Sequence, residues 1–239
     1  MAGNRILTTS VVVVSTQDAL TENLKSNTTI NLGADILLST IKAESPTGVI
    51  IHNGQAGLVV DGLGLYEVDG QNAVRCFYIS GGGVNVVIQN LVITRGSGNG
   101  GGLYIKKAEV RLTSCTISKN NGIGVNVGGG LYITSATVSL VNCAIVDNKA
   151  HRAGGIGIND GQLLLAGCLI SDNSAYGSSD LLLSNGSYVA VLSSCTGDSY
   201  DAGQGTIECA GCSTTYPADL LNGECTPCPV LAPYSCCGS

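Results

Sequence analysis

Residues 129–148 read GGLYITSATVSLVNCAIVDN, and the pattern returns as GGLYIKKAEVRLTSCTISKN at 101–120 and as GGIGINDGQLLLAGCLISDN at 154–173. Each copy contains a pair of glycines, a short apolar strand, a second strand followed by cysteine, and a polar turn ending in asparagine. Less regular copies on both sides continue the series with a period of 24 to 28 residues. A fixed period of this size indicates an array of identical structural units.

Alignment of the copies places apolar residues in columns. In the second strands, apolar residues such as Val110 and Leu112 alternate with polar residues such as Arg111, which is the period of a β-strand. One column of second-strand residues contains Val60, Ile88, Leu112, Leu140, Leu165 and Leu192, and the next contains Leu63, Leu91, Cys115, Cys143, Cys168 and Cys195. The first strands supply the pairs Val49 and Ile51, Phe77 and Ile79, Leu103 and Ile105, Leu131 and Ile133, Ile156 and Ile158, and Leu181 and Leu183. Stacked repeats would bury these columns as one continuous core.

The pattern predicts an all-β fold, a single-stranded parallel β-helix of about seven coils over residues 31–200. Residues 1–30 are expected to form an N-terminal strand and a short capping helix, and residues 201–239 a cysteine-rich tail. In the helix, Thr16 or Ser15 is a candidate N-cap, and Leu20 and Leu24 would lie over the first coil. A hydrophobic content of 44% favours a packed core over disorder, despite 34 glycines.

The repeats also resemble those of a class of surface proteins. A Gly-Gly-x-x-apolar segment that leads to a turn ending in Asn resembles the short repeats of polymorphic outer-membrane (autotransporter-type) proteins; the matching segments are 101–120, 129–148 and 154–173. More broadly, the region from about residue 30 to 200 is similar to the pectin-lyase-like superfamily of right-handed β-helices. This resemblance implies a right-handed solenoid. The superfamily contains polysaccharide lyases, hydrolases and epimerases, so it also implies an enzymatic alternative.

The eleven cysteines fall into two groups. The column cysteines and Cys76 are expected to be buried free thiols, although neighbouring coils could bring two column cysteines within bonding reach. The tail contains Cys209, Cys212, Cys225, Cys228, Cys236 and Cys237. The two C-x-x-C pairs have the spacing of a four-cysteine zinc site, whereas the even count suits three disulfides. The segments 209–217 and 222–229 resemble the cysteine-rich modules of ephrin-receptor-like regions, and that resemblance implies disulfides.

Tail disulfides would place the protein in an oxidising compartment. The sequons at Asn27 and Asn185 permit glycosylation and favour the same location. We therefore expect an extracellular or cell-surface protein, although the first residues show no signal-peptide pattern and the targeting segment would lie outside this chain. No apolar run approaches the length of a membrane span.

Candidate catalytic groups are sparse. Sugar hydrolysis needs two carboxylates that face one bond, and lyase chemistry needs an acidic calcium site with a basic residue. Asp147 and Asp172 stack 25 residues apart, each followed by asparagine. We interpret this as a solvated turn column with a ladder formed by Asn120, Asn148 and Asn173. The sequence thus predicts no catalytic residue, no metal site and no cofactor.

The net charge and the placement of the histidines argue against nucleic-acid binding and against a site built from both histidines. The net charge is −6, and Lys106-Lys107 is the one adjacent basic pair, which argues against nucleic-acid binding. His52 and His151 are about a hundred residues apart and are expected to lie in separate surface turns.

One surface feature stands out. The outward position of the first strands holds Tyr78, Tyr104 and Tyr132, which predicts an exposed aromatic ribbon. Such a ribbon can stabilise the sheet by cross-strand stacking, or it can bind a protein partner or a glycan. The sequence favours a non-catalytic extracellular structural or adhesive module, part of a surface or multiprotein assembly. The alternative is a carbohydrate-active enzyme of the pectin-lyase-like type.

Overall fold

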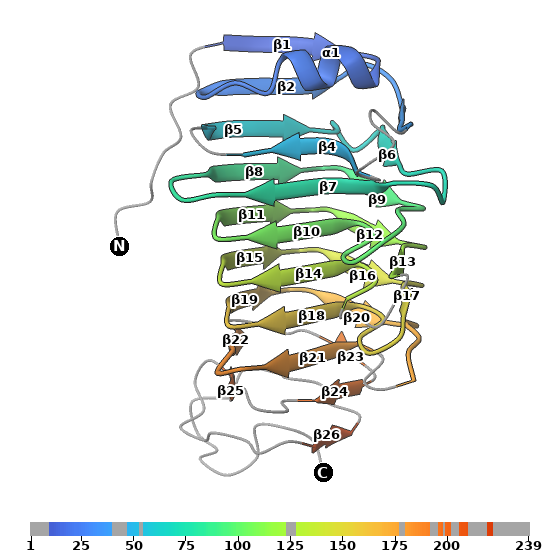
Figure 1. The fold of residues 1–239 in the computed structure, drawn as a ribbon, viewed down its shortest axis with the longest axis vertical. Coiled ribbons are helices and arrows are strands. Elements are labelled where there is room, and N and C mark those ends of the chain that lie inside the picture. Colours follow the sequence, from blue (N-terminus) through green and yellow to red (C-terminus); the bar gives the residue numbers. More distant parts are fainter. Residues whose placement is uncertain are drawn as a thin grey trace.

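The chain winds as a parallel β-helix whose strands lie one above another in successive turns (Figure 1). The structure is a computed structural model. It describes residues 10–39, 47–52, 55–122, 128–176, 180–191, 196–197, 199–201, 206–209 and 219–221. Strand pairs are parallel except for β24 with β26, which is antiparallel.

Three sheets form the walls of the solenoid, and a small fourth sheet lies at one corner. The nine-stranded sheet contains β1 (Ser10–Val14), β2 (Thr28–Leu32), β5 (Ala56–Asp61), β8 (Asn85–Gln89), β11 (Glu109–Thr113), β15 (Thr137–Val141), β19 (Gln162–Ala166), β22 (Tyr188–Val191) and β25 (Thr206–Cys209). The eight-stranded sheet contains β4 (Thr47–Ile51), β7 (Arg75–Ser80), β10 (Leu103–Lys106), β14 (Leu131–Thr134), β18 (Ile156–Asn159), β21 (Leu181–Ser184), β24 (Ser199–Asp201) and β26 (Asp219–Leu221). The seven-stranded sheet contains β3 (Ile36–Leu37), β6 (Glu67–Asp69), β9 (Val92–Thr94), β12 (Thr116–Ser118), β16 (Ala144–Val146), β20 (Leu169–Ser171) and β23 (Thr196–Gly197). The fourth sheet pairs β13 (Asn121–Gly122) with β17 (Lys149–Ala150).

In the part of the chain that the structure describes, six turns contain one strand from each wall, from β4–β5–β6 to β21–β22–β23. The sequence predicted about seven coils. The difference arises at the ends, because the turn of β2 and β3 and the turn of β24 and β25 each have strands in only two walls. The architecture is otherwise the predicted all-β parallel solenoid.

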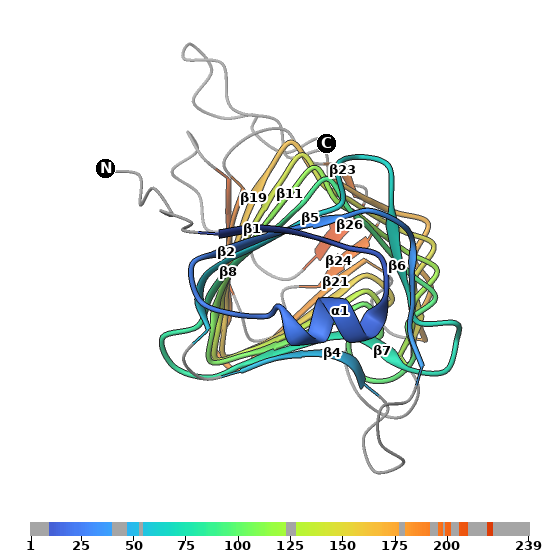
Figure 2. The ribbon, with the colours of Figure 1, turned by 90° about the horizontal axis from the view of Figure 1, so that it is seen from above.

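The first turn contains the helix α1 (Gln17–Glu22), which lies within the stretch predicted to be helical. Thr16 is its N-cap, and the Thr16 hydroxyl accepts a hydrogen bond from the Ala19 N–H at 3.2 Å. The helix lies beside β4 (Figure 2). There the Gln17 side-chain amide donates to the Gly48 carbonyl at 3.2 Å. Thus α1 occupies the place that a strand of the eight-stranded sheet takes in later turns.

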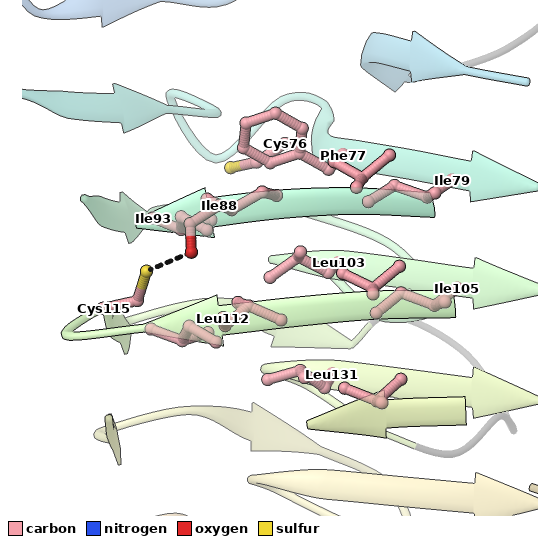
Figure 3. Close-up of a cluster of buried hydrophobic side chains, with 14 of the residues drawn as sticks. Cys76, Phe77, Ile79, Ile88, Ile93, Leu103, Ile105, Leu112, Cys115 and Leu131 are labelled. Carbon is pink, nitrogen blue, oxygen red and sulfur yellow. Dashed lines mark hydrogen bonds between the residues drawn. The ribbon is translucent and has the colours of Figure 1, made fainter. Parts of the chain in front are cut away.

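The predicted apolar columns form much of the core (Figure 3). The core also contains a column of the seven-stranded sheet that was not predicted, formed by Val68, Ile93, Ile117, Ile145 and Ile170. Strand register pairs Ile88 with Leu112, Leu112 with Leu140, and Leu140 with Leu165. The column residues Val60, Ile88, Leu112, Leu140 and Leu165 are buried, as are all twelve inward residues predicted in the first strands. Leu20 and Leu24 join this core from the N-terminal end. The predicted column member Leu192 lies outside the described residues.

The prediction that Leu63 is a core residue is wrong. Leu63 is 47% exposed, with φ of +57°, instead of packing against Leu91 in the buried column. Five residues join β5 to β6, whereas two join β8 to β9. Tyr66 directly precedes β6, as Leu91 precedes β9, and it packs against the core in that place. The three extra residues, 63–65, form a turn whose Leu65 is 74% exposed.

The column cysteines are free thiols, as expected. Cys115, Cys143 and Cys168 are buried and form no disulfide bond, and the same holds for Cys76. The Cys115 thiol contacts the Ile88 carbonyl of the preceding turn at 3.4 Å (Figure 3). The neighbouring Cys115 thiol and burial raise the pKa of Cys143, so this thiol is protonated and acts as a small apolar side chain. Cys195 lies outside the described residues.

Candidate functional site

The tyrosine strip, formed by Tyr78, Tyr104 and Tyr132, lies on the outer face of the eight-stranded sheet. Strand register places the three residues directly above one another in β7, β10 and β14. The ring centroids of Tyr78 and Tyr104 are 5.3 Å apart in an edge-to-face arrangement. Those of Tyr104 and Tyr132 are 5.0 Å apart and stacked. The strip therefore forms by the predicted register.

The strip is half-buried, so the prediction of an exposed ribbon is only partly right. Arg75 covers it: its guanidinium carbon lies 5.8 Å from the Tyr78 ring centroid and 5.3 Å from that of Tyr104. The Arg75 Nε also donates to the Asn99 carbonyl at 2.8 Å. Burial lowers the pKa of Arg75 from its usual value, but a guanidinium remains charged at neutral pH.

This geometry limits what the strip can bind. Tyr104 stacks on Tyr132, meets Tyr78 edge to face, and has the Arg75 guanidinium near its ring, so it is less open to a ligand than an isolated tyrosine. A sugar ring that stacks on tyrosine needs an open face, whereas a protein surface can contact ring edges. The contacts thus restrict the stacking of a sugar ring on Tyr104. They also provide cation–π and aromatic stabilisation of the sheet itself.

The other outward residues of this row differ in exposure. Ile50, above Tyr78, is 37% exposed. Gly157 follows Tyr132 in register, and Leu182, which follows Gly157, is only 6% exposed. The continuous aromatic segment is therefore limited to three turns.

The predicted asparagine ladder exists, but it is buried rather than solvated. Asn120, Asn148 and Asn173 are 1%, 1% and 7% exposed. The Asn120 Nδ2 donates to the Asn148 Oδ1 at 2.9 Å, and the Asn148 Nδ2 donates to the Asn173 Oδ1 at 3.0 Å. At one end the Gly96 N–H donates to the Asn120 Oδ1, and at the other the Asn173 Nδ2 donates to buried Asp180. The ladder satisfies backbone groups inside the corner where the chain turns, so its role is structural.

The ladder also explains the paired glycines. A β-carbon on the second glycine of each pair, Gly102, Gly130 or Gly155, would lie 3.0 Å from the Nδ2 atom of a ladder asparagine. It would also lie 2.6, 2.9 and 2.5 Å, respectively, from a backbone oxygen of the next turn. The Gly-Gly and Asn features of the repeat are therefore two sides of one packing contact.

The stacked acidic turn residues lie outside this ladder. Asp147 and Asp172 are exposed, with φ of +56° and +57°, and Lys119 has the same conformation one turn earlier. Asp and Asn tolerate this left-handed conformation better than most residues. Their placement is explained by turn geometry.

A charged cluster at the seven-stranded sheet was not predicted. The buried Asp69 carboxylate accepts two hydrogen bonds from the Arg95 guanidinium, of which the Nε bond is 2.9 Å. Burial alone would raise the pKa of Asp69, but Arg95 and the Gln71 N–H lower it below the usual value. Burial and nearby carboxylates raise the pKa of Glu67. The signal in the sequence was opposite charges 26 residues apart, about one period, which reads as a structural ion pair.

The remaining predicted residues lie apart from one another. Asn27 and Asn185 are exposed in turns with positive φ, and the Asn185 Nδ2 donates to the Asn159 Oδ1 at 2.5 Å. His52 and His151 are exposed, and the His151 ring lies 5.5 Å from that of Tyr176. In the tail, Cys209 is the last residue of β25, and the structure describes its backbone only. The other tail cysteines lie outside the described residues: Cys212, Cys225, Cys228, Cys236 and Cys237.

Two further properties concern only the part of the chain that the structure describes. There, no three His, Cys, Asp or Glu side chains are grouped closely enough to hold a metal ion. The helix α1 has six residues, and no described helix has the length and apolarity of a membrane span.

Comparison with known families assigns residues 39–196 to the family described as right handed beta helix region. No curated protein and no solved structure matches the chain significantly. The matched region extends from just before β4 to the start of β23, which includes nearly all of the six complete turns. The chain therefore belongs to the family of right-handed β-helix regions.

Proposed function

We propose that this protein is a non-catalytic structural or adhesive module, a component of a surface or multiprotein assembly. The observation that carries the proposal is the tyrosine strip on an outer wall, with Arg75 against two of its rings. Tyr and Arg are enriched where proteins bind one another. The strip lies on a wall of parallel strands in register, so the partner would meet a preformed surface.

The internal construction supports the same role. Apolar columns and the asparagine ladder repeat from turn to turn, so each turn depends on its neighbours. Such a solenoid is suited to holding surface residues at fixed spacing along its length. We also propose the finer relationships implied by the sequence, to pectin-lyase-like proteins and to polymorphic outer-membrane repeats.

We propose an extracellular or cell-surface location. The tail cysteines support it if they form disulfides, and exposed Asn27 and Asn185 support it as acceptors for glycans. A non-reducing peptide map of secreted protein should yield tail cysteine pairs, and Asn27→Gln and Asn185→Gln should each reduce the glycosylated mass. Free tail thiols, or a stoichiometric zinc ion, would contradict this location.

The binding role is tested by isolating the native complex, identifying its members by mass spectrometry, and repeating the capture with variants. Tyr104→Ser should weaken capture of the partner, and the lost ring contacts should lower stability only modestly, by about 1–2 kcal/mol. Tyr176→Ser is the matched control, because Tyr176 is 92% exposed and outside the strip, and it should leave capture unchanged. If Tyr104→Ser lowers stability without affecting capture, the strip serves only to stabilise the sheet. Cleavage of acidic polysaccharides in the presence of calcium would instead support the enzymatic alternative.

A further inference from the structure

The N-terminal end of the solenoid presents three sheet edges that are protected differently. The edge strand of the eight-stranded sheet, β4, is covered by α1 and bonded by the Gln17 amide. The edge strand of the seven-stranded sheet, β3, has only two residues. The edge strand of the nine-stranded sheet, β1, has five residues and lies at the end of the solenoid (Figure 1). No described element pairs with its outer side.

The sequence of β1 lacks the usual protection of an edge strand. It reads Ser-Val-Val-Val-Val, with no charge and no proline, and it pairs with β2 without a bulge. Proteins normally block such an edge with charged residues, proline, a bulge or a covering segment. Val11 and Val13 are 65% and 70% exposed on the outer face. The strand is thus well suited to pair with another strand.

The hydrogen bonds of β1 show which of its backbone groups are open. The Ser10 N–H donates to the Asn27 carbonyl at 3.4 Å, and the Gly33 N–H donates to the Val14 carbonyl at 2.7 Å. Residues 10, 12 and 14 therefore direct both backbone groups toward β2, by the alternation of a parallel ladder. The N–H and C=O groups of Val11 and Val13 then point to the outer side. These four groups form a complete edge of a potential antiparallel pair.

We propose that β1 pairs with β1 of a second copy of this chain, antiparallel and about a two-fold axis at Val12. Val11 would lie opposite Val13 of the second copy, and Val13 opposite its Val11. In an antiparallel ladder, a hydrogen-bonded pair exchanges two bonds, so these two pairs satisfy all four open groups of each copy. The side chains of the paired valines then meet on the outer face. The axis leaves neither β1 edge open, so the assembly closes as a dimer.

A second copy is favoured because the edge is complementary to itself. The open groups are spaced symmetrically about Val12, and each residue within one position of the axis is valine, so the two-fold operation brings identical chemistry together. Addition of a parallel strand would instead leave a new open edge. Four hydrogen bonds and two valine pairs form a small contact, so the dimer should be weak and concentration-dependent. This inference does not depend on the proposed function.

The test is sedimentation velocity of the full chain across a micromolar concentration series. The mean mass of the wild type should rise from the 24.2 kDa of one chain toward twice that value. Val13→Pro removes an N–H that points to the outer side and leaves the bonds to β2; it should weaken the dimer by about tenfold or more, because two bonds are lost per dimer. Val13→Thr keeps the N–H and the β-branched shape, and it should retain the dimer.

A second variant guards against local disruption by proline. Val11→Lys combined with Val13→Lys leaves the backbone intact and places four lysines about the axis, so it should also abolish the dimer. Thermal melts should show that both variants fold like the wild type. A wild type that remains monomeric throughout the series would overturn the proposal. So would a dimer that persists in both variants, because its contact would then lie elsewhere.

Discussion

The central turns, β10 to β20, and the N-terminal end of the solenoid follow different rules. In the central turns two of the three corners repeat the same internal contacts: a buried cysteine at one, and an asparagine packed against glycine at the other. Near the N-terminal end these features are replaced by a helix, an inserted turn and an ion pair. Among the residues that the structure describes, six of the eight large exposed apolar residues lie there: Val11, Val13, Leu37, Ile50, Leu63 and Leu65.

The difference shows what repetition does for this fold. Where the repeat is strict, each inward side chain packs against or hydrogen-bonds to the equivalent side chain of the next turn. Few large apolar side chains are then exposed. Where the repeat is interrupted, local contacts must close the structure, and apolar side chains reach the surface.

The largest expected effect concerns the asparagine ladder. Asn148→Ala would remove the acceptor of the Asn120 Nδ2 and the donor to the Ile117 carbonyl, and leave both buried. Each unsatisfied buried group costs about 1–3 kcal/mol, so we expect a loss of about 3 kcal/mol or more in urea unfolding. Asp147→Asn, at the exposed neighbouring position, should change stability by less than about 0.5 kcal/mol. Equal effects of the two variants would show that the ladder is not a structural element.

Substitution of a paired glycine should cause the next largest loss of stability. In Gly130→Ala the new β-carbon would lie 2.9 Å from the Gly155 oxygen and 3.0 Å from the Asn148 Nδ2, so we expect a loss of about 1–3 kcal/mol in thermal unfolding. Gly82→Ala is the control, because no atom lies within 4 Å of its β-carbon position, and it should be neutral or slightly stabilising. A neutral Gly130→Ala would mean that the turns are spaced more loosely than described.

Acid titration probes the ion pair near the N-terminal end. The pKa of Asp69 is lowered in the folded state, so the carboxylate stabilises the fold above its ordinary pKa, and this contribution is lost as the pH falls through the folded-state value. Urea unfolding below about pH 4 should therefore be less pH-dependent in Asp69→Asn than in the wild type. An unaltered acid slope in Asp69→Asn would contradict the lowered pKa.

The smallest effect, with the opposite sign, concerns the inserted turn. Leu63 has φ of +57° and is largely exposed, and asparagine tolerates this conformation better. Leu63→Asn should stabilise the protein by up to about 1 kcal/mol in thermal unfolding. Leu91→Asn, at the buried position of the next turn, should destabilise it by several times that amount. If Leu63→Asn is as damaging as Leu91→Asn, Leu63 is a core residue after all.

Much of the fold could be predicted because burial and strand alternation act identically in every turn. Leu112, Leu140 and Leu165 share a column for this reason, and Tyr104 and Tyr132 share an outer row. Leu63 was misplaced because a constant period hides an insertion of three residues, which only the contact of Tyr66 with the core reveals. The burial of the asparagine ladder was missed because asparagine is common in exposed turns. The repeat period alone does not indicate that the asparagine side chains at this corner point into the interior.

The register of the turns is the central claim, and a distance across several turns tests it most directly. Val59 and Ala190 both face outward on the nine-stranded sheet, five strand steps apart, from β5 through β8, β11, β15 and β19 to β22. Spin labels attached at both positions through a ketone-bearing amino acid, which spares the native cysteines, can be measured by pulsed dipolar spectroscopy. At about 4.8 Å per step, we predict a narrow distribution centred near 24 Å. A broad distribution, or a centre displaced by two or more steps, would contradict the stacked solenoid.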